Sequence, residues 1–155
     1  MKRILSIITL CACTLSININ AIAADEDDVK VDPKSIYARI GGDAAINAAV
    51  DAFYVKVLAD KRVNHFFEDV NMKRQAKRQK AFLSAAFGGP TPYKGKDMRK
   101  AHKHLDLTEK DFGVIAGHLQ STLQDLKIDP KLIDEVMAVA GSVKDAVLNR
   151  PEKKK

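Results

Sequence analysis

Helical spacing of apolar residues, interrupted by glycine and proline, is the feature of this sequence that most restricts its fold. Apolar residues recur every three or four positions in four long stretches, and no stretch alternates apolar and polar residues as a half-buried strand does. Gly88-Gly89-Pro90 and Asp129-Pro130 separate neighbouring stretches. The pattern predicts an all-α domain of four sizeable helices and several short ones.

Capping residues predict where these helices begin. The expected N-caps are Asp43, Asn71, Thr108 and Asp129. Thr108 and Asp111 have the spacing of a capping box, and Pro130 is tolerated in a first turn. The predicted long helices cover about 44–58, 71–87, 108–126 and 130–147, with short segments at 63–67 and 98–105.

The N-terminus has the layout of a secretory signal peptide over residues 1–23. Lys2 and Arg3 precede a mostly apolar run over 4–19, and Ala21-Ile22-Ala23 supplies a small-x-small cleavage site. The run is too short and interrupted to span a bilayer well, so we expect an exported, periplasmic protein without a stable membrane span. A lipid-anchored form at Cys13, an uncleaved anchor and an ordinary buried helix are the alternatives.

The rest of the chain divides into a flexible leader (24–34), a domain (35–150) and a basic tail (151–155). Both cysteines, Cys11 and Cys13, lie in the presequence, so the mature chain has no disulfide or cysteine metal site. The formal net charge is +6, and removal of Lys2 and Arg3 lowers it to +4. This mild charge argues against a nucleic-acid partner.

Two glutamines interrupt the apolar stripe of the helix predicted at 71–87. Gln75 and Gln79 are four apart and share one face, whereas the lysines and arginines lie mainly on the other side. A buried amide without a partner costs about 1–3 kcal/mol. Either the stripe is partly exposed and the amides are solvated, or they meet a ligand together with the Tyr54 hydroxyl. Such a pocket suits a small polarised ligand, such as a metal-bound diatomic.

One of the four histidines could be the axial ligand of a haem. None has the spacing of a zinc site. His102 and His104 project about 200° apart on a helix, so both cannot face one iron. We expect His118 to be packed and hydrogen-bonded and His65 to lie at the surface, but spacing alone does not choose the ligand.

Taken in order, a set of motifs resembles the group 1 (N-type) truncated haemoglobins over about 35–150. The matching motifs are Ser35-Ile36-Tyr37, Ile40-Gly41-Gly42, residues 53–60, Phe66-Phe67, Asn71-Met72, Gln75 with Gln79, Phe87-Gly88-Gly89-Pro90, Pro92-Tyr93, Gly95, Met98, His102 and Ala116-Gly117-His118-Leu119. The resemblance implies a truncated globin, a two-over-two helical sandwich around haem b and its iron. It also implies that the glycine motifs let the chain turn around the haem.

The resemblance also assigns roles to individual residues. It implies that His102 is the proximal iron ligand and that Phe67 packs against the porphyrin. The residues implied to hydrogen-bond the diatomic ligand are Tyr54, Gln75 and Gln79. The residues implied to line the haem slot are Met72, Phe82, Leu83, Met98 and Leu119. Those that could reach the propionates are Arg78, Tyr93 and Arg99.

Two departures from cyanobacterial members of that family affect the haem. Those relatives place an iron-binding histidine one residue before the second glutamine, where this chain has Arg78. We therefore expect a five-coordinate iron. The same relatives carry a histidine in the last helix that attaches to a haem vinyl group, and residues 141–150 contain none here. We therefore expect non-covalent haem.

The favoured function is binding of O2, NO or CO, with dioxygenation of NO to nitrate. Turnover requires a separate electron donor or reductase, because the chain has no flavin or nicotinamide domain. The cations at 94, 96, 99, 100 and 103 either receive that donor or form a solvated cluster. The alternatives are a non-catalytic O2 or NO carrier or sensor, a haem redox or peroxidase-type protein, and a helical interaction domain without haem. We expect a monomer or weak dimer.

Overall fold

The computed structural model describes residues 30–151, and all of the regular structure in that range is helical. Its elements are α1 (Ile36–Ile40), α2 (Gly42–Ala59), the 3-10 helix η1 (Asn64–Phe67), α3 (Met72–Ala86), α4 (Met98–His102), α5 (Glu109–Asp125), α6 (Pro130–Ser142) and α7 (Lys144–Val147). The all-α prediction, with four sizeable helices, is confirmed. The proposed signal peptide, the leader before Lys30 and the tail after Pro151 lie outside the described residues.

Three of the four predicted N-caps are confirmed. The Asn71 side chain accepts from the Arg74 N–H, and the Asp129 side chain accepts from the N–H groups of Lys131 and Leu132. At the start of α5, both halves of the Thr108–Asp111 capping box are present. Each such cap satisfies backbone N–H groups that have no partner within the helix, so local sequence alone fixes these starts.

The expected cap at Asp43 is wrong, because α2 begins at Gly42 and its N-cap is Gly41. Gly41 has φ 107° and is also the C-cap of α1. This left-handed conformation favours glycine, and it lets two helices meet with one shared residue between them. Asp43 instead lies in the first turn of α2, where its negative charge suits the helix dipole and its carboxylate accepts from Ser84 Oγ at 3.3 Å.

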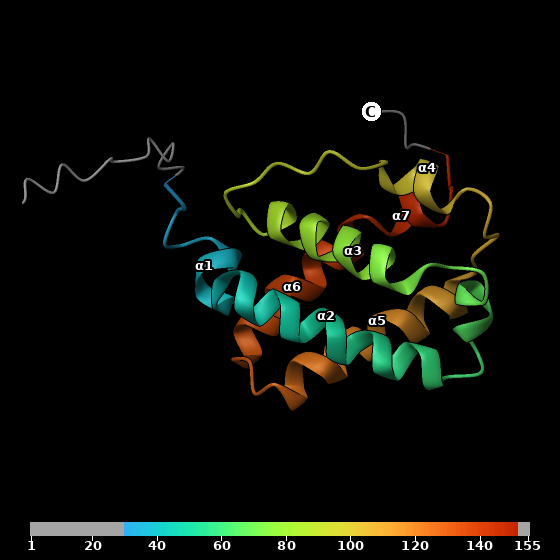
Figure 1. Cartoon of the computed structure of the whole chain (residues 1–155), viewed down its shortest axis with the longest axis horizontal. Helices are drawn as coiled ribbons and strands as arrows, with labels where there is room; N and C mark the ends of the chain where they lie inside the picture. Colours follow the sequence, from blue (N-terminus) through green and yellow to red (C-terminus); the bar gives the residue numbers. More distant parts are fainter. Residues whose placement is uncertain (1–29, 152–155) are drawn as a thin grey trace, which may run out of the picture.

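The last predicted helix, 130–147, is interrupted near its end. Helix α6 stops at Ser142, and α7 is a separate short helix. Gly141 and Ser142 are weak helix formers, and Ser142 Oγ donates to the Val139 carbonyl at 2.7 Å. The break allows α7 to leave the line of α6 and to pack against α4 (Figure 1).

The buried core lies around α2, α5 and α6. Six of its aliphatic side chains have 0–1% exposure, namely Ile46, Val50, Val57, Val63, Leu123 and Val136. Helix α2 packs against α3 on one side and α5 on the other (Figure 1).

No helix among the described residues is long and apolar enough to cross a membrane.

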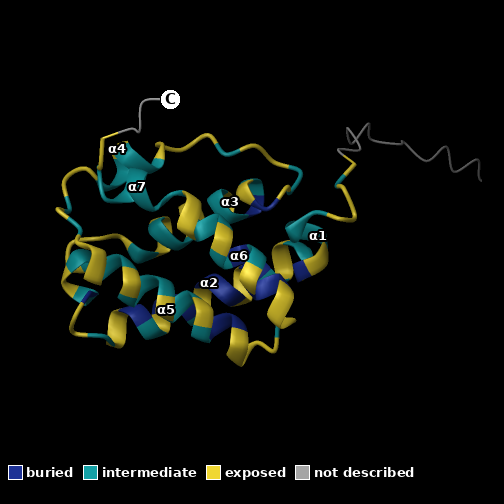
Figure 2. Cartoon of the chain, turned by 180° about the vertical axis from the view of Figure 1, so that it is seen from behind, coloured by how far each residue is buried: buried dark blue, intermediate teal, exposed yellow. Residues whose placement is uncertain are grey.

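Helices α3, α4 and α7 contain far fewer buried residues than α2, α5 and α6. Ser84 is the one buried residue within α3, and α4 and α7 have none. Figure 2 shows the same division, with α4 and α7 largely at intermediate exposure. The apolar side chains of these helices are therefore not fully covered by the protein itself.

The turn that follows α3 requires two glycines, each for a different reason. Gly88 has φ 86°, as expected for a turn that ends a helix. Gly89 does not have positive φ, but a Cβ there would lie 2.5 Å from Ser84 Oγ and 2.8 Å from Tyr37 Cδ2. The turn therefore packs closely on α1 before the loop at 88–97 passes alongside α3 to α4 (Figure 1).

A charged cluster joins the end of α2 to α5. Asp60 accepts two hydrogen bonds from Arg62 Nε and one from Arg62 Nη2, and His118 Nε2 lies 2.7 Å from Asp60 Oδ2. This confirms that His118 is a packed, hydrogen-bonded histidine. The side chain and backbone N–H of Arg62, followed by His118, hold the pKa of Asp60 far below its ordinary value.

Asp60→Asn should reduce the loss of stability that the protein suffers in acid. A carboxyl whose pKa is lower in the folded state stabilises the fold fully at pH values above its unfolded pKa of about 4, and this contribution shrinks as the pH falls from that value toward the lower folded-state pKa. Urea unfolding at neutral pH and at about pH 3 measures the difference. Asp125→Asn is the control for an exposed ion pair, and an equal acid loss in wild type and Asp60→Asn would contradict the assignment.

Candidate functional site

Tyr54, Gln75 and Phe67 meet between α2, α3 and η1. Gln75 Nε2 donates to Tyr54 Oη at 3.2 Å. The Tyr54 and Phe67 rings lie 5.8 Å apart at 76°, an edge-to-face arrangement. Three predicted site residues from separate segments of the chain therefore lie next to one another, and the tyrosine at their centre is 7% exposed.

The faces of α3 are arranged as the sequence predicts. Gln75 and Gln79 are half-buried, whereas Lys73, Arg74 and Lys77 are exposed. Gln79 lies one turn after Gln75 on the same face of α3. The reading in which both amides are simply solvated is therefore not supported, because Gln75 has a side-chain partner from α2.

Burial determines the protonation of Tyr54. Desolvation raises the pKa of its phenol, and the hydrogen bond from Gln75 opposes this only in part. The phenol is therefore protonated at neutral pH. Because its oxygen accepts from Gln75, its own hydrogen remains to be donated to a further acceptor.

Helix α4 holds His102 in one defined tautomer. The Asp97 side chain caps the helix by accepting from the Lys100 N–H at 2.8 Å. His102 Nδ1 lies 2.7 Å from the Met98 carbonyl oxygen, one turn earlier. A carbonyl can only accept, so Nδ1 carries the proton, and in the neutral ring Nε2 keeps the lone pair that binds metals. His104 and His65 are exposed, as expected for histidines with no ligand role.

Helix α4 is anchored by the C-terminal end of the domain. Arg99 Nη1 donates to the Arg150 carbonyl at 2.7 Å, although a propionate was the partner predicted for Arg99. Glu109 at the start of α5 pairs with both Lys144 and Arg150. Sequence reasoning missed Glu109 and Arg150, since residues about forty apart give no local sign that they pair.

The residues expected to line the slot are partly buried. Met72, Leu83 and Leu119 pack against the edge of the core, and Met98 is half-buried on α4. Phe82 and Tyr93 form an edge-to-face pair with ring centroids 5.4 Å apart, which joins α3 to the loop that follows it. Arg78 is exposed on α3.

This donor set fits a flat metal–porphyrin better than a bare ion. The described residues contain no group of three His, Cys, Asp or Glu side chains that could hold a metal ion. They do offer one imidazole with a free ring nitrogen, half-buried apolar side chains and a buried phenol that accepts a hydrogen bond from a half-buried amide. A haem needs one axial ligand, apolar cover for the macrocycle and polar groups on the ligand side.

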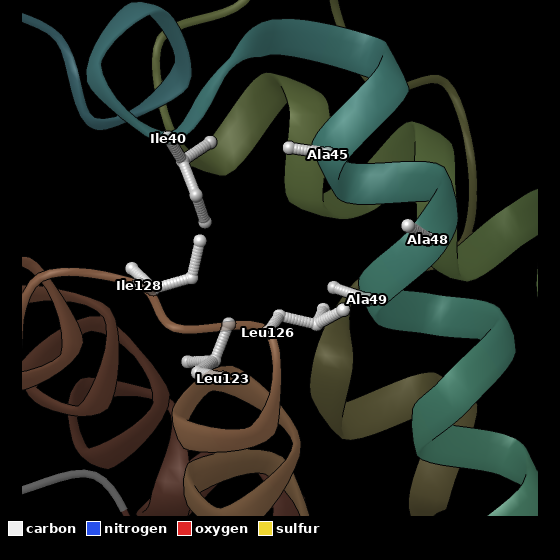
Figure 3. A pocket seen from close by; sticks show the side chains of 7 residues that line it. All are labelled: Ile40, Ala45, Ala48, Ala49, Leu123, Leu126 and Ile128. Atoms are coloured by element: carbon white, nitrogen blue, oxygen red, sulfur yellow. The ribbon is translucent and has the colours of Figure 1, made fainter.

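Two further pockets lie away from these residues. The first, of about 140 Å³, is lined by aliphatic side chains from α1, the first half of α2 and the end of α5 (Figure 3). The second, of about 230 Å³, lies along α5 and the start of α6. Neither includes a residue predicted to touch haem or its ligand.

Comparison with known proteins identifies the family. A model of the bacterial-like globins matches residues 35–149. A group 1 truncated haemoglobin of Chlamydomonas moewusii is 46% identical over 133 residues, which are 84% of this chain and 78% of that protein. The chain belongs to the group 1 truncated haemoglobins. Haem and its iron are accordingly its expected cofactor, and ligand binding at haem is the activity that the family implies.

Solved truncated haemoglobins have the same fold. The Fe(III) form of the Tetrahymena pyriformis protein has a TM-score of 0.72 and 42% identity, covering 74% of this chain and 98% of its own. The Synechococcus haemoglobin crystallised in the cyanomet state with covalently attached haem has a TM-score of 0.71 and 46% identity, covering 75% and 99%. The predicted two-over-two fold is therefore confirmed.

His102→Ala should abolish stable haem binding while the helices remain. The variant removes the single ring nitrogen proposed as axial ligand and leaves the Asp97 cap of α4 intact. We expect a protein with helical circular dichroism that retains little haem after gel filtration. His104→Ala, on the exposed side of the same segment, is the matched control and should bind haem normally. Equal haem retention in both variants would contradict the assignment.

Arg99→Ala should release haem faster, by about tenfold, because α4 then loses its link to the Arg150 carbonyl. One hydrogen bond from a charged group is worth roughly 1.5–3 kcal/mol at most, so a tenfold effect is a moderate expectation. Transfer of haem to excess apomyoglobin measures the rate. Lys100→Ala removes an exposed pair with Asp97 and should leave the rate nearly unchanged.

Proposed function

We propose that this protein binds O2 at a haem iron held by His102 and dioxygenates NO to nitrate. The observation that carries the proposal is the pair of buried Tyr54 and half-buried Gln75, which offers hydrogen-bond donors beside the ring of Phe67. The reaction combines O2, NO and one electron into nitrate, so each turnover requires a reducing equivalent. The haem supplies the iron at which O2 binds and from which that electron comes.

The residues of the chain have distinct tasks in this proposal. His102 Nε2 would hold the iron, and the proton on its Nδ1 is fixed by the Met98 carbonyl. Tyr54 and Gln79 would donate hydrogen bonds to the bound ligand, with Gln75 orienting the phenol. Arg78 offers no imidazole that would compete with the ligand for the iron, which is why we propose a five-coordinate iron.

Further proposals concern haem attachment and export. The haem is non-covalent, because residues 141–150 provide no histidine to react with a vinyl group. Residues 1–23 direct the chain to the periplasm and are then removed, with a lipid-anchored form at Cys13 as the alternative. The reductant comes from a separate protein.

Rapid mixing of the O2-loaded ferrous protein with NO tests the activity. We expect prompt oxidation of the haem with about one nitrate formed per haem, measured by stopped-flow absorption and ion chromatography. A stable oxygenated spectrum that NO leaves unchanged would reject the dioxygenase and favour an O2 carrier or sensor. A protein that stays colourless with added haemin would reject haem binding altogether.

Tyr54→Phe should raise the O2 dissociation rate by about tenfold or more. The variant removes a donor to the ligand, and a hydrogen bond to an acceptor with partial negative charge contributes roughly 1.5–3 kcal/mol. Flow–flash or displacement kinetics give the rate. Tyr37→Phe, on α1 next to Gly42, is the matched control and should not change it. An unchanged rate in Tyr54→Phe would remove the tyrosine from the ligand site.

A further inference from the structure

Among residues 30–151, the net positive charge is concentrated in one segment. Residues 72–104, which comprise α3, the following loop and α4, hold ten lysines and arginines against one aspartate, a net charge of +9. Residues 30–71 hold six of each sign, and residues 105–151 hold five basic against eight acidic residues. The modest overall charge therefore conceals a strongly positive side, formed by the segments that carry Gln75 and His102.

Five of these cations are exposed on α3, in the loop that follows it and just after α4. We define the rim cations as Arg74 and Arg78 on α3, Lys94 and Lys96 in the loop, and Lys103 after α4. Arg74 and Arg78 are four apart on one flank of α3, and Arg78 is three residues from Gln75, so this flank adjoins the Gln75 face of the helix. The loop that carries Lys94 and Lys96 runs alongside α3 toward α4 (Figure 1).

The rim cations are available to a partner. All five are exposed, and none forms an ion pair with another residue in the range 30–151. Two other cations of the segment are engaged, Lys80 with Asp51 at 2.7 Å and Lys100 with Asp97 at 3.1 Å. Uncompensated like charges repel one another, and an acidic surface placed over them relieves this repulsion.

We propose that the rim cations form the docking surface for an acidic, one-electron carrier protein. This inference rests on the proposed dioxygenase, which consumes one electron per turnover and for which we propose a separate electron donor. The carrier loses one electron and the haem iron gains it, with no transfer of atoms. Positive charge on the segments that carry Gln75 and His102 would steer such a carrier toward the proposed haem site, as rapid electron transfer requires.

The first test is binding without electron transfer. Oxidised flavodoxin of an acidic type is titrated into the ferric protein by calorimetry at several salt concentrations. We expect Kd to rise steeply with salt and to rise about tenfold or more at low salt in the Lys94→Glu/Lys96→Glu variant. The matched variant Lys127→Glu/Lys131→Glu changes the net charge equally at the turn between α5 and α6, away from α4, and should alter Kd less than about twofold (Figure 1).

The second test is the rate of reduction by flavodoxin hydroquinone, followed by stopped flow. We expect the rate to fall in parallel with affinity for the rim variant and to stay near wild type for the matched variant. Equal effects of the two variants on Kd and rate would overturn the proposal. The proposal would also be overturned if duplex DNA or anionic vesicles bound the protein more tightly than flavodoxin does, and if the rim variant but not the matched variant weakened that binding. The result would then favour a nucleic acid or a membrane as the partner.

These outcomes are separate from those of the proposed function. The test of the proposed function uses protein that is first reduced with dithionite and then oxygenated in air. Its reaction with NO therefore needs no carrier protein. If that reaction fails while the rim variant still weakens flavodoxin binding, the dioxygenase is wrong and the docking surface stands. If that reaction succeeds while both variants bind flavodoxin alike, only the docking surface is wrong.

Discussion

The structure depends on an apolar interior that its own helices do not fully cover. Helices α2, α5 and α6 bury a tight aliphatic core, with residues such as Val57 and Val136 at 0–1% exposure. Helices α3, α4 and α7 bury almost nothing, although they carry Phe82, Leu83 and Met98. Burial of apolar surface is the main favourable term in folding. A large, flat apolar group inserted between the two sets would complete that burial, and the family's haem is such a group.

The two groups of proposed site residues are held by different kinds of interaction. Tyr54 belongs to the core through α2, so its position is as rigid as the core itself. Helix α4, which carries His102, has five residues and no buried one, and Arg99 ties it to the end of the domain through the Arg150 carbonyl. Packing therefore fixes the proposed ligand-binding tyrosine in advance, whereas the helix with the proposed iron ligand relies on Arg99 and on the haem that it would hold.

The segments that contain the fewest buried residues are also the most positively charged. The segments that bury least, α3 to α4, also hold the net +9, because side chains that are not needed for the core are free to be cationic. The acidic excess lies in residues 105–151, where Glu109 and Asp145 pair with the C-terminal cations. A scaffold with one packed side and one open side thus presents the ligand site and the positive surface together.

The sequence by itself determined the helices, most of their caps and the side chains offered at the proposed ligand site. Asn71, Thr108 and Asp129 act on backbone groups within a few residues, so their effect is local and readable. The amide pair at 75 and 79 was visible for the same reason, since helical spacing puts both on one face. The choice of His102 among four histidines came from resemblance to a family, because spacing alone left it open.

Only the tertiary structure decided the features that join distant segments. Gly41, not Asp43, is the N-cap of α2 because the chain turns sharply there between α1 and α2, and Gly89 lacks a side chain because Tyr37 and Ser84 leave no space for one. The link from Arg99 to Arg150 and the cluster of Asp60 with His118 join residues fifty or more positions apart. No local pattern encodes such pairs, because they exist only after packing has set the distances between helices.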